Sequence, residues 1–586
     1  MDQFEQIVST LEYYVWEFGP AVGDQTIPIV VIALLGTGIF LTLRLGFIQL
    51  RRFAHGVAVA SGIYDDPDEP GDVTHFQALS TALSATVGIG NIAGVAIAIH
   101  FGGPGALFWM WVTAIFGMAV KYTEVTLAQH YRQSETADTF SQKLIGTVSG
   151  GPMYYIEGGL GKNWKALAVF SATALMITSF FTGNAIQANT VADVVGAEWA
   201  IPAWAIGLFT SAVIGLVILG GIRRIGRVTG ILVPFMATIY VLGALLILAF
   251  NYDQILPSLG RIITDAFDPT AGVAGMGTGA FLLTLMWGVR RGLFSNEAGM
   301  GSAPIAHAAA QTDEPVSEGV VALLEPFIDT ILICTMTGLV IITTGSWGDP
   351  VASEFDLTSG DLSFRAETQS GQFESRSMPS QFRVEDGAPL RTESEGRLAW
   401  QGFPVDSFFV DPAQQDPFTG TIRPGEGQAV AEGGATYTTL YGDAPQTGAP
   451  LTRLAFERGL SPLGSWGGYI VLFSVLLFAI STSISWSYYG DRCANYLFGH
   501  GAIVPYKVIF VVMHFVGAVA ALTTIWTVGD IFLGLTVFPN LLALILLSGV
   551  VVKVTKSYFE REPWHENYRV QQRIREEKRK EKEEGS

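Results

Sequence analysis

The sequence predicts an all-α membrane protein with eleven transmembrane helices and a small β-rich insert outside the membrane. The chain has 586 residues, of which 49% are hydrophobic and only 15% are charged, and its mean hydropathy is +0.39. Soluble proteins have about 25% charged residues. Several apolar runs also reach the roughly 20 residues needed to span a bilayer. A soluble protein with buried helices could not place so many long runs in its core.

The membrane body is predicted in two parts, residues 27–345 with eight helices and residues 466–555 with three. The first 26 residues contain five acidic side chains and no basic region, so we expect no cleavable signal peptide. The predicted helices span residues 27–47, 77–99, 105–128, 164–188, 203–221, 228–250, 273–294, 317–344, 466–489, 503–526 and 529–553.

Basic residues in the short loops predict the orientation in the membrane. With eleven alternating crossings, six basic loops or helix ends fall on one side, which is therefore expected to be cytoplasmic. Residues 1–26 would then lie outside the cell (inner) membrane, and the C-terminus would be cytoplasmic. The basic residues are Arg44, Arg51, Arg52, Arg132, Lys143, Arg223, Arg224, Arg227, Arg290, Arg291, Arg492, Lys553 and Lys556.

Residues 346–465 form a predicted extracytoplasmic insert. Between Asp349 and Arg458 there are 17 acidic and 8 basic residues. Their balance of −9 is half of the net charge of the chain, −18. This balance argues against nucleic acid as a partner, because nucleic-acid binding needs a basic surface. The stretches 381–385, 398–403 and 435–441 resemble strands between turn residues, so we expect a small β domain, with a disordered loop as the alternative.

The remaining segments suggest little chemistry. Residues 556–586 form a tail whose charges alternate as in a solvated cytoplasmic helix. Cys334 and Cys493 lie in or beside apolar segments and are expected to be unpaired.

The second predicted helix contains the most informative stretch, Leu79–Ile99, in which Gly88, Gly90 and Asn91 interrupt an apolar run. A spanning helix tolerates such a break only where the freed backbone groups are used, as in transporters that bind solutes at mid-membrane. The amides that begin the second half-helix suit a carboxylate, and the carbonyls that end the first half suit a cation.

This reading assigns residues to two ligands. Ile89 and Gly90 would bind the carboxylate, carbonyls near Ser84, Thr86 and Val87 would bind the cation, and Asn91 would offer an amide oxygen. The alternative is a helix-packing face, because Gly90 and Gly94 form a GxxxG motif.

Two other helices supply polar groups. In the ninth helix, Ala479, Thr482 and Ser483 share one face, where hydroxyls and a carbonyl could complete an all-oxygen cation site, and Trp486 could wall a pocket. Hydroxyls that bond to their own helix are the alternative. In the fourth helix, Gln187 could bind a zwitterion without burying a charge, or could simply bond to another helix.

The seventh helix is a second glycine-interrupted segment, with Gly275 and Gly279 at its start and Glu297 after its end. It comes five helices after the first interrupted helix, which is the spacing that an inverted repeat of two five-helix halves requires. We interpret Glu297 as a cytoplasmic gate or loop residue. Lys121 and Glu124 are three residues apart and are expected to pair. No catalytic or metal-binding motif is present, so no enzyme activity is expected.

Four strings together resemble the alanine or glycine:cation symporter family, the sodium:alanine symporters. They are residues 81–96, TALSATVGIGNIAGVA; residues 150–156, GGPMYYI; residues 221–227, GIRRIGR; and residues 291–304, RGLFSNEAGMGSAP. The resemblance covers about residues 25–345 and 465–555. It implies a leucine-transporter-like core of five plus five helices, with the first helix peripheral.

The resemblance also implies site residues. Substrate would contact Ile89, Gly90, Gln187, Thr482 and Trp486, next to Thr86 and Asn91. Sodium would be held by carbonyls of Ser84, Val87 and Ala479 and by hydroxyls of Thr482 and Ser483. Ile89 stands where the family usually has Thr, and the insert is not part of the family core.

The expected function is secondary-active symport, in which sodium drives import of a small neutral amino acid such as alanine or glycine by alternating access. Besides these two ligands and the lipid bilayer, no cofactor is expected. The sequence leaves open the oligomeric state, the choice of alanine, glycine or serine, and sodium against proton. The alternatives are a sodium-conducting channel-like protein and a non-transporting amino-acid receptor.

Overall fold

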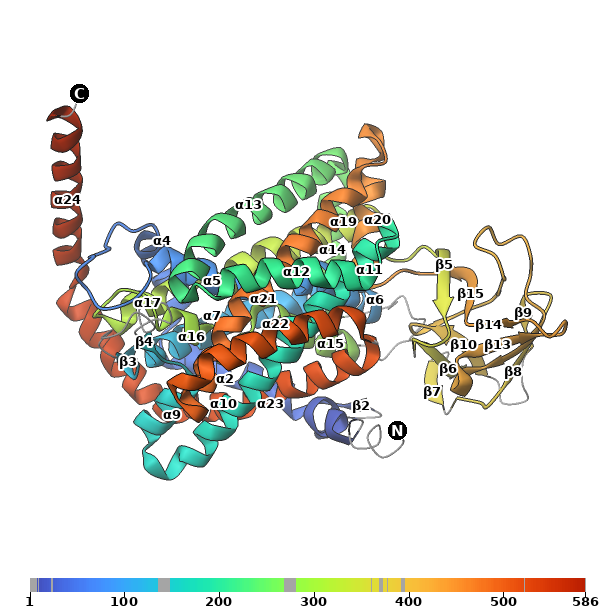
Figure 1. Cartoon of the computed structure of the whole chain (residues 1–586), viewed down its shortest axis with the longest axis horizontal. Coiled ribbons are helices and arrows are strands. Elements are labelled where there is room, and N and C mark those ends of the chain that lie inside the picture. The colour runs from blue at the N-terminus through green and yellow to red at the C-terminus, as the bar shows by residue number, and fades with distance from the viewer. Residues whose placement is uncertain are drawn as a thin grey trace.

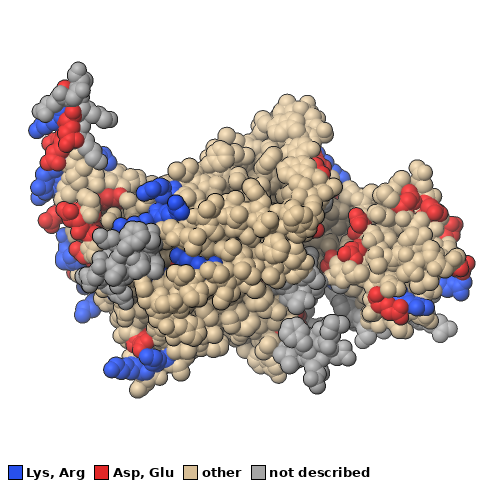
Figure 2. All heavy atoms as spheres, viewed as in Figure 1, with Lys and Arg blue, Asp and Glu red and all other residues tan. Residues whose placement is uncertain are grey.

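The computed structural model of the chain describes residues 8, 10–22, 25–134, 148–267, 281–359, 361–367, 373–376, 378–390, 396–520 and 522–584. They form a helical bundle with a β-rich domain at one end, which we call the insert end (Figure 1). The opposite end carries α4 (Phe53–Ala60), α17 (Pro315–Ala322) and α24 (Trp564–Glu584). We call it the basic end, because Lys and Arg side chains gather there (Figure 2).

Long apolar helices form the bundle. Among the described residues, seven helical stretches are long and apolar enough to cross a membrane, and a bent pair makes an eighth. The elements of the seven are α7 (Ala106–His130); η3 (Lys162–Trp164), α10 (Lys165–Phe180), η4 (Phe181–Ala185) and α11 (Ile186–Trp199); α13 (Gly221–Phe250); α17, α18 (Leu324–Pro326), η5 (Phe327–Cys334) and α19 (Thr335–Thr343); α21 (Gly467–Phe498); η8 (His500–Ala502) and α22 (Ile503–Val519); and α23 (Leu522–Arg561).

Three further predicted spans correspond to shorter helices, α2 (Ile29–Arg44), α12 (Ala203–Ile218) and α15 (Phe281–Asn296). Each has 16 residues, which is fewer than a perpendicular crossing usually needs. Seven or eight apolar spans are therefore established, and the count of eleven stays a prediction. The start of the predicted seventh helix, with Gly275 and Gly279, lies outside the described residues.

The outer surface of the bundle is apolar. Large hydrophobic side chains of α12, α13 and α22 are exposed instead of being buried in the core. Figure 2 shows that the middle of this face is almost free of charged side chains. An exposed apolar surface of this extent marks contact with another apolar phase, here the lipid. Examples are Leu208, Phe209, Leu216, Ile231, Phe235, Leu242, Val504 and Val508.

Short elements complete the bundle. Cys334 and Cys493 are both buried and unpaired, as the sequence predicts. The short elements are η1 (Tyr13–Glu17), β1 (Ala21–Val22), β2 (Gln25–Thr26), α3 (Ile48–Arg51), β3 (Gln133–Ser134), β4 (Val148–Ser149), α9 (Pro152–Leu160), α14 (Tyr252–Phe267), α16 (Ala303–His307), α20 (Gly448–Leu460) and η7 (Ser461–Leu463).

The insert contains antiparallel strands around its own core. One sheet has the order β11-β10-β6-β7, a second has the order β14-β13-β12-β8-β9, and β5 pairs with β15. In β8, Phe382 and Val384 are buried while the residues between and after them are exposed, which is the alternation of a half-buried strand. The strands are β5 (Val351–Asp356), β6 (Leu362–Glu367), β7 (Phe373–Arg376), β8 (Phe382–Glu385), β9 (Ala388–Pro389), β10 (Gly396–Trp400), β11 (Phe403–Pro404), β12 (Gly420–Arg423), β13 (Gln428–Ala431), β14 (Thr436–Tyr437) and β15 (Thr439–Ala444), with the 3-10 turn η6 (Pro424–Glu426).

Two helices are interrupted where the sequence has glycine. The first pair is α5 (His75–Thr86), which begins with a Thr74 capping box, and α6 (Val95–Gly102), which follows the π-turn η2 (Gly90–Gly94). The halves are bent by 52°, which confirms the predicted break. The second interruption lies between α15 and α16, where Glu297, Gly299 and Gly301 have positive φ angles of 54°, 96° and 80°.

Candidate functional site

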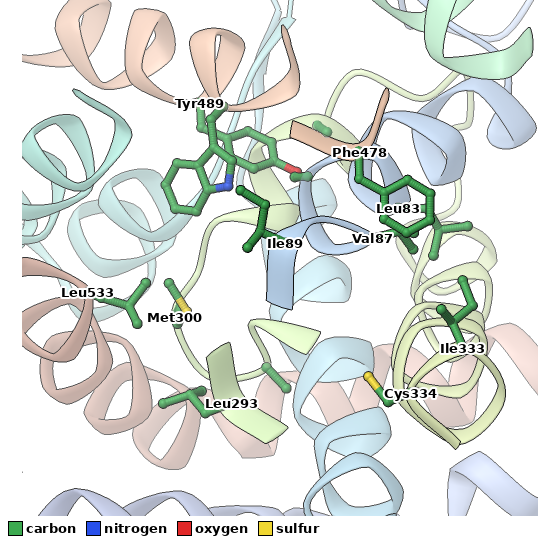
Figure 3. Packing of buried hydrophobic residues seen from close by; sticks show 14 of the residues in the cluster. Leu83, Val87, Ile89, Leu293, Met300, Ile333, Cys334, Phe478, Tyr489 and Leu533 are labelled. Atoms are coloured by element: carbon green, nitrogen blue, oxygen red, sulfur yellow. The ribbon is translucent and has the colours of Figure 1, made fainter. Parts of the chain in front are cut away.

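A small cavity lies beside the break between α5 and η2. Every predicted substrate residue except Asn91 lines it. The space open to the centre of a water-sized sphere is about 20 Å³, slightly more than the about 10–15 Å³ that one water needs. Figure 3 shows Ile89, Met300 and Leu533 among the apolar side chains around this region. The lining residues are Ala85, Thr86, Gly88, Ile89, Gly90, Thr182, Gln187, Phe294, Glu297, Thr482, Trp486 and Leu533.

The side chain of Asn91 closes the break instead of lining the cavity. Its Oδ1 accepts the backbone N–H of Gly88 at 2.8 Å, and its Nδ2 donates to Asp329 Oδ1 at 2.6 Å and to Ser295 Oγ at 3.2 Å. Both ends of this buried amide are therefore used within the protein. Asn91 ties the first interrupted helix to the end of α15 and to η5, where the sequence suggested a direct ligand.

Two glycines explain why the chain breaks here. A Cβ at position 88 would lie 2.6 Å from Thr482 Oγ1, so only glycine lets α21 approach this closely. A Cβ at position 90 would lie 3.1 Å from the Phe294 ring. By contrast, a Cβ at Gly94 would have its nearest neighbour at 4.0 Å. The GxxxG pair therefore does not form a close packing face, and Gly88 and Gly90 act at the break itself.

Unpaired polar groups face the cavity. Ile89 and Gly90 lie at the start of the helical turn η2, and backbone N–H groups at a helix start generally lack an acceptor within the helix. The Gln187 side chain donates from Nε2 to the Thr182 carbonyl at 3.1 Å. Its Oε1 is buried and has no hydrogen-bond partner among the described residues. The cavity thus offers donors on one wall and a free acceptor on another, a combination that suits a zwitterion.

Trp486 forms one wall. It is 1% exposed, and its indole packs directly on Gly183, where a Cβ would lie 2.3 Å from the ring. The indole Nε1–H donates to Glu297 Oε1 at 3.1 Å. These contacts fix the ring position, so that Trp486 limits the size of what the cavity can hold.

Glu297 is the ionisable residue among those that line the cavity. It is buried, and Ser302 Oγ donates to its other carboxylate oxygen. We interpreted Glu297 from the sequence as a cytoplasmic gate or loop residue. It lies in the loop between α15 and α16, and its side chain also lines the cavity. The sequence does contain a clue to this position, because Glu297 lies close to Gly299 and Gly301, and glycines at this spacing can interrupt a helix.

The five predicted sodium ligands lie where α5 meets α21, and all are buried. Ser84 Oγ donates to the Ser481 carbonyl at 2.7 Å, and Thr482 Oγ1 donates to the Ala85 carbonyl at 3.3 Å. Ser483 Oγ is buried without a hydrogen-bond partner among the described residues. Ser483 is thus a buried hydroxyl whose hydrogen-bonding capacity is not used by the described residues. The five residues are Ser84, Val87, Ala479, Thr482 and Ser483.

One expectation for the basic end was wrong. Lys121 does not form its close pair with Glu124, because its Nζ lies 3.0 Å from Glu325 Oε2. Glu124 Oε1 instead accepts the backbone N–H groups of Gly299 and Gly301, each at 3.1 Å. Sequence spacing could suggest only partners within a turn, whereas Glu325 is brought there by the fold.

Comparison with known proteins identifies the family. The model of the sodium:alanine symporter family matches residues 1–373 and 433–572. The sodium/alanine symporter AgcS of Methanococcus maripaludis is 38% identical, covering 95% of this chain and 98% of AgcS. The probable sodium/glutamine symporter GlnT of Bacillus subtilis is 30% identical, covering 90% of this chain and 87% of GlnT. Among solved structures, MhsT in complex with L-phenylalanine has a TM-score of 0.45 at 13% identity, covering 82% of this chain and 89% of MhsT.

The family match includes the membrane body and the beginning of the insert, and it leaves out residues 374–432. Its members and the relatives are transporters, so the chain is a multi-pass membrane transporter and not an enzyme. The chain belongs to the sodium:alanine symporter family, a family of cation-coupled amino-acid transporters.

Proposed function

We propose that the chain imports small neutral amino acids, alanine or glycine, together with sodium by alternating access. The observation that supports this most directly is the cavity at the first interrupted helix. There, helix-start amides, the Gln187 oxygen without a partner among the described residues, and the Thr482 hydroxyl of α21 surround one small space. The basic end would face the cytoplasm, because short basic loops are retained on that side.

The substrate carboxylate would bind the amides of Ile89 and Gly90, where the helix dipole favours negative charge. Its ammonium group would donate to Gln187 Oε1, the acceptor that lacks a partner within the described residues. Trp486 and Leu533 line the cavity and restrict its size. GlnT is named for glutamine, and the restricted cavity here favours alanine or glycine over that larger cargo.

Sodium would bind one layer away, between the end of α5 and the middle of α21. The carbonyls of Ser84, Val87 and Ala479 and the hydroxyls of Thr482 and Ser483 would supply its oxygens. Thr482 also lines the cavity, so each ligand orders a residue that the other needs. Binding of the two must then be cooperative, and the coupling must be reciprocal.

The test uses the purified full chain in proteoliposomes. An inward sodium gradient should drive saturable uptake of labelled alanine, and a negative interior should increase it, since 100 mV is worth about 2.3 kcal/mol per charge. Preloaded unlabelled alanine should support counterflow. Sodium conductance without counterflow would favour the channel-like alternative, and alanine binding without uptake would favour the receptor.

A further inference from the structure

Arg291 in α15 is a buried cation without an acidic partner. The residue is only 7% exposed. Its Nε–H group is buried and has no hydrogen-bond acceptor among the described residues. Within the same part of the chain, its guanidinium forms no ion pair and no other hydrogen bond. The function proposed above gives this residue no role.

The structure places Arg291 between the cavity and the insert end. It lies one helical turn before Phe294, which lines the cavity. The earlier part of α15 meets the end of α6, because Thr284 Oγ1 donates to the Gly102 carbonyl at 2.8 Å. In the same turn of α6, both ring nitrogens of His100 contact backbone carbonyls of the insert. Figure 1 also shows α6 and α15 at this end of the bundle.

The acidic group near Arg291 is already paired with another residue. Asp530 in α23 interacts electrostatically with Arg291, but its Oδ2 lies 3.3 Å from Nη2 of the neighbouring Arg290. The other oxygen, Oδ1, is buried and has no hydrogen-bond partner among the described residues, so it does not bond to Arg291. Glu12 also faces Arg290 and Asp530. Arg291 is therefore the arginine of this pair whose charge has no direct partner in the described chain.

Two aromatic rings lie beside the guanidinium but do not neutralise it. Arg291 Cζ lies 5.4 Å from the centre of the Trp287 ring and 5.6 Å from that of Phe294. A cation–π contact is worth less than the desolvation penalty of a buried ion. Ionisable side chains inside a membrane body almost always pair with another group or face water. A bound anion would supply the missing partner of Arg291.

The surroundings favour a small anion with a single charge. One guanidinium supplies one positive charge, so an anion with two charges would leave a buried negative charge. Guanidinium is weakly hydrated, and the neighbouring walls are aromatic, which suits a halide that loses its water readily. Arg291 is not among the residues that line the cavity. The carboxylate of a substrate bound at the amides of Ile89 and Gly90 would therefore not contact it.

We propose that Arg291 binds one chloride ion on the insert side of the cavity, and that this ion stabilises the sodium-loaded protein. The binding site itself depends only on Arg291, whereas its effect on uptake rests on the proposed transport function. Sodium brings a positive charge into the same membrane body, and like charges repel. Chloride at Arg291 would cancel the buried positive charge beside the interrupted helices. Sodium should then bind more tightly when chloride is present.

The first experiment measures thermal unfolding of the purified full chain while chloride replaces gluconate at fixed sodium concentration and ionic strength. A ligand of the folded state raises the unfolding temperature, and the rise follows the ligand concentration. The wild type should show this rise, and bromide should replace chloride. Arg291→Gln should show no rise. Arg261→Gln is the matched control, because Arg261 also lies over a tryptophan ring, that of Trp347 at 4.6 Å, but has its own acid, Asp265, at 3.2 Å. It should respond like the wild type.

The second experiment measures sodium-driven alanine uptake into proteoliposomes in chloride and in gluconate. Uptake by the wild type and by Arg261→Gln should be several-fold faster in chloride. The rate of Arg291→Gln should be equal in the two media, because this variant has no buried charge for the anion to neutralise.

The wild type alone decides the question if Arg291→Gln does not fold. An unfolding temperature that is independent of chloride would overturn the anion site. An equal chloride response in Arg291→Gln would also overturn it, because the ion would then bind elsewhere. Competitive inhibition of alanine uptake by chloride would assign Arg291 to the carboxylate of the substrate and overturn a separate chloride site. Chloride-dependent stability that requires Arg291, without any alanine uptake, would support the site and contradict the proposed function.

Discussion

The side-chain amide of Asn91 joins three segments that are distant in the sequence. It holds the Gly88 N–H of the break and reaches Ser295 at the end of α15 and Asp329 in η5. Both interrupted helices therefore meet at one residue. The shape of the cavity depends on this residue even though Asn91 does not line it.

Replacement of Asn91 by Leu should abolish sodium-dependent alanine uptake. The variant leaves the Gly88 N–H and the Asp329 carboxyl without their partner, at a cost of about 1–3 kcal/mol for each unsatisfied group. Uptake into proteoliposomes and the amount of inserted protein should be measured together. Asn251→Leu is the control, because the Asn251 amide bonds only within its own helix, and full uptake in Asn91→Leu would contradict the assignment.

Replacement of Trp486 should widen substrate choice. Trp486→Phe removes the N–H bond to Glu297 and some volume, and Trp486→Ala opens the wall further. Larger neutral amino acids, including glutamine, should then compete better with labelled alanine, and the alanine variant should show the larger effect. The measurement is the inhibition of labelled alanine uptake by a series of unlabelled amino acids. An unchanged inhibition profile in both variants would contradict a role for Trp486 in the substrate pocket.

At the scale of residues, the sequence identified most of the residues that line the cavity, but it did not identify Glu297, the ionisable residue among them. Gly90, Gln187, Thr482 and Trp486 stand out because they are polar, small or aromatic within apolar runs, and Ile89 stands out because it lies between Gly88 and Gly90. The contact between Lys121 and Glu325 spans 204 positions, and spacing within one helix cannot reveal a partner so far away.

At the scale of elements, the interrupted helix depends on glycines that are not equivalent. A Cβ at Gly88 would collide with the Thr482 hydroxyl, whereas a Cβ at Gly94 would meet only Arg291 Cδ at 4.0 Å. Helix propensity treats the two alike, since each weakens a helix by roughly 1 kcal/mol relative to alanine. Because their surroundings differ, substitution of Gly88 should affect the site, whereas substitution of Gly94 should affect only helix stability.

Gly88→Ala should therefore lose sodium-dependent uptake, because its Cβ would collide with Thr482 Oγ1, a predicted ligand of both sodium and substrate. Gly94→Ala should keep uptake, because its Cβ meets nothing closer than 4.0 Å. Initial uptake rates at several sodium concentrations would test both. Equal loss in the two variants would indicate a general helix effect instead of a site.

The first break was predictable because glycines and Asn91 interrupt a long apolar run. The π-turns η4 and η5 were not predicted, since one extra residue in a helical turn leaves no mark on hydrophobic periodicity. The sequence also placed the ends of several helices within a few residues, because polar and glycine residues bound the apolar runs.

At the scale of the whole molecule, the β domain joins the bundle through a few contacts. Both ring nitrogens of His100 in α6 lie 3.0 Å from backbone carbonyls, those of Gln401 and Gln446. The helix α20, which follows the strands, sits on the break itself, because Thr452 Oγ1 donates to the Ile92 carbonyl at 2.9 Å. This helix packs on the membrane body, although the sequence prediction includes it in the insert of residues 346–465.

The effect on uptake of removing the β domain should then depend on which residues are deleted. Val351 and Ala444 are paired across β5 and β15, so a short glycine-serine linker could replace residues 351–444, and this variant should keep uptake. Removal of residues 350–458 takes most of α20 and should lose uptake. Uptake in proteoliposomes tests both, and loss in the shorter deletion would favour the receptor alternative.

The burial of both native thiols has a practical consequence. Cys334 and Cys493 are 0% exposed, so maleimide reagents should find almost no target in the untouched chain. One cysteine introduced on α20 and another on the β domain could then carry fluorophores or spin labels without prior replacement of the native cysteines. The distance between α20 and the β domain during turnover could then be followed by spectroscopy.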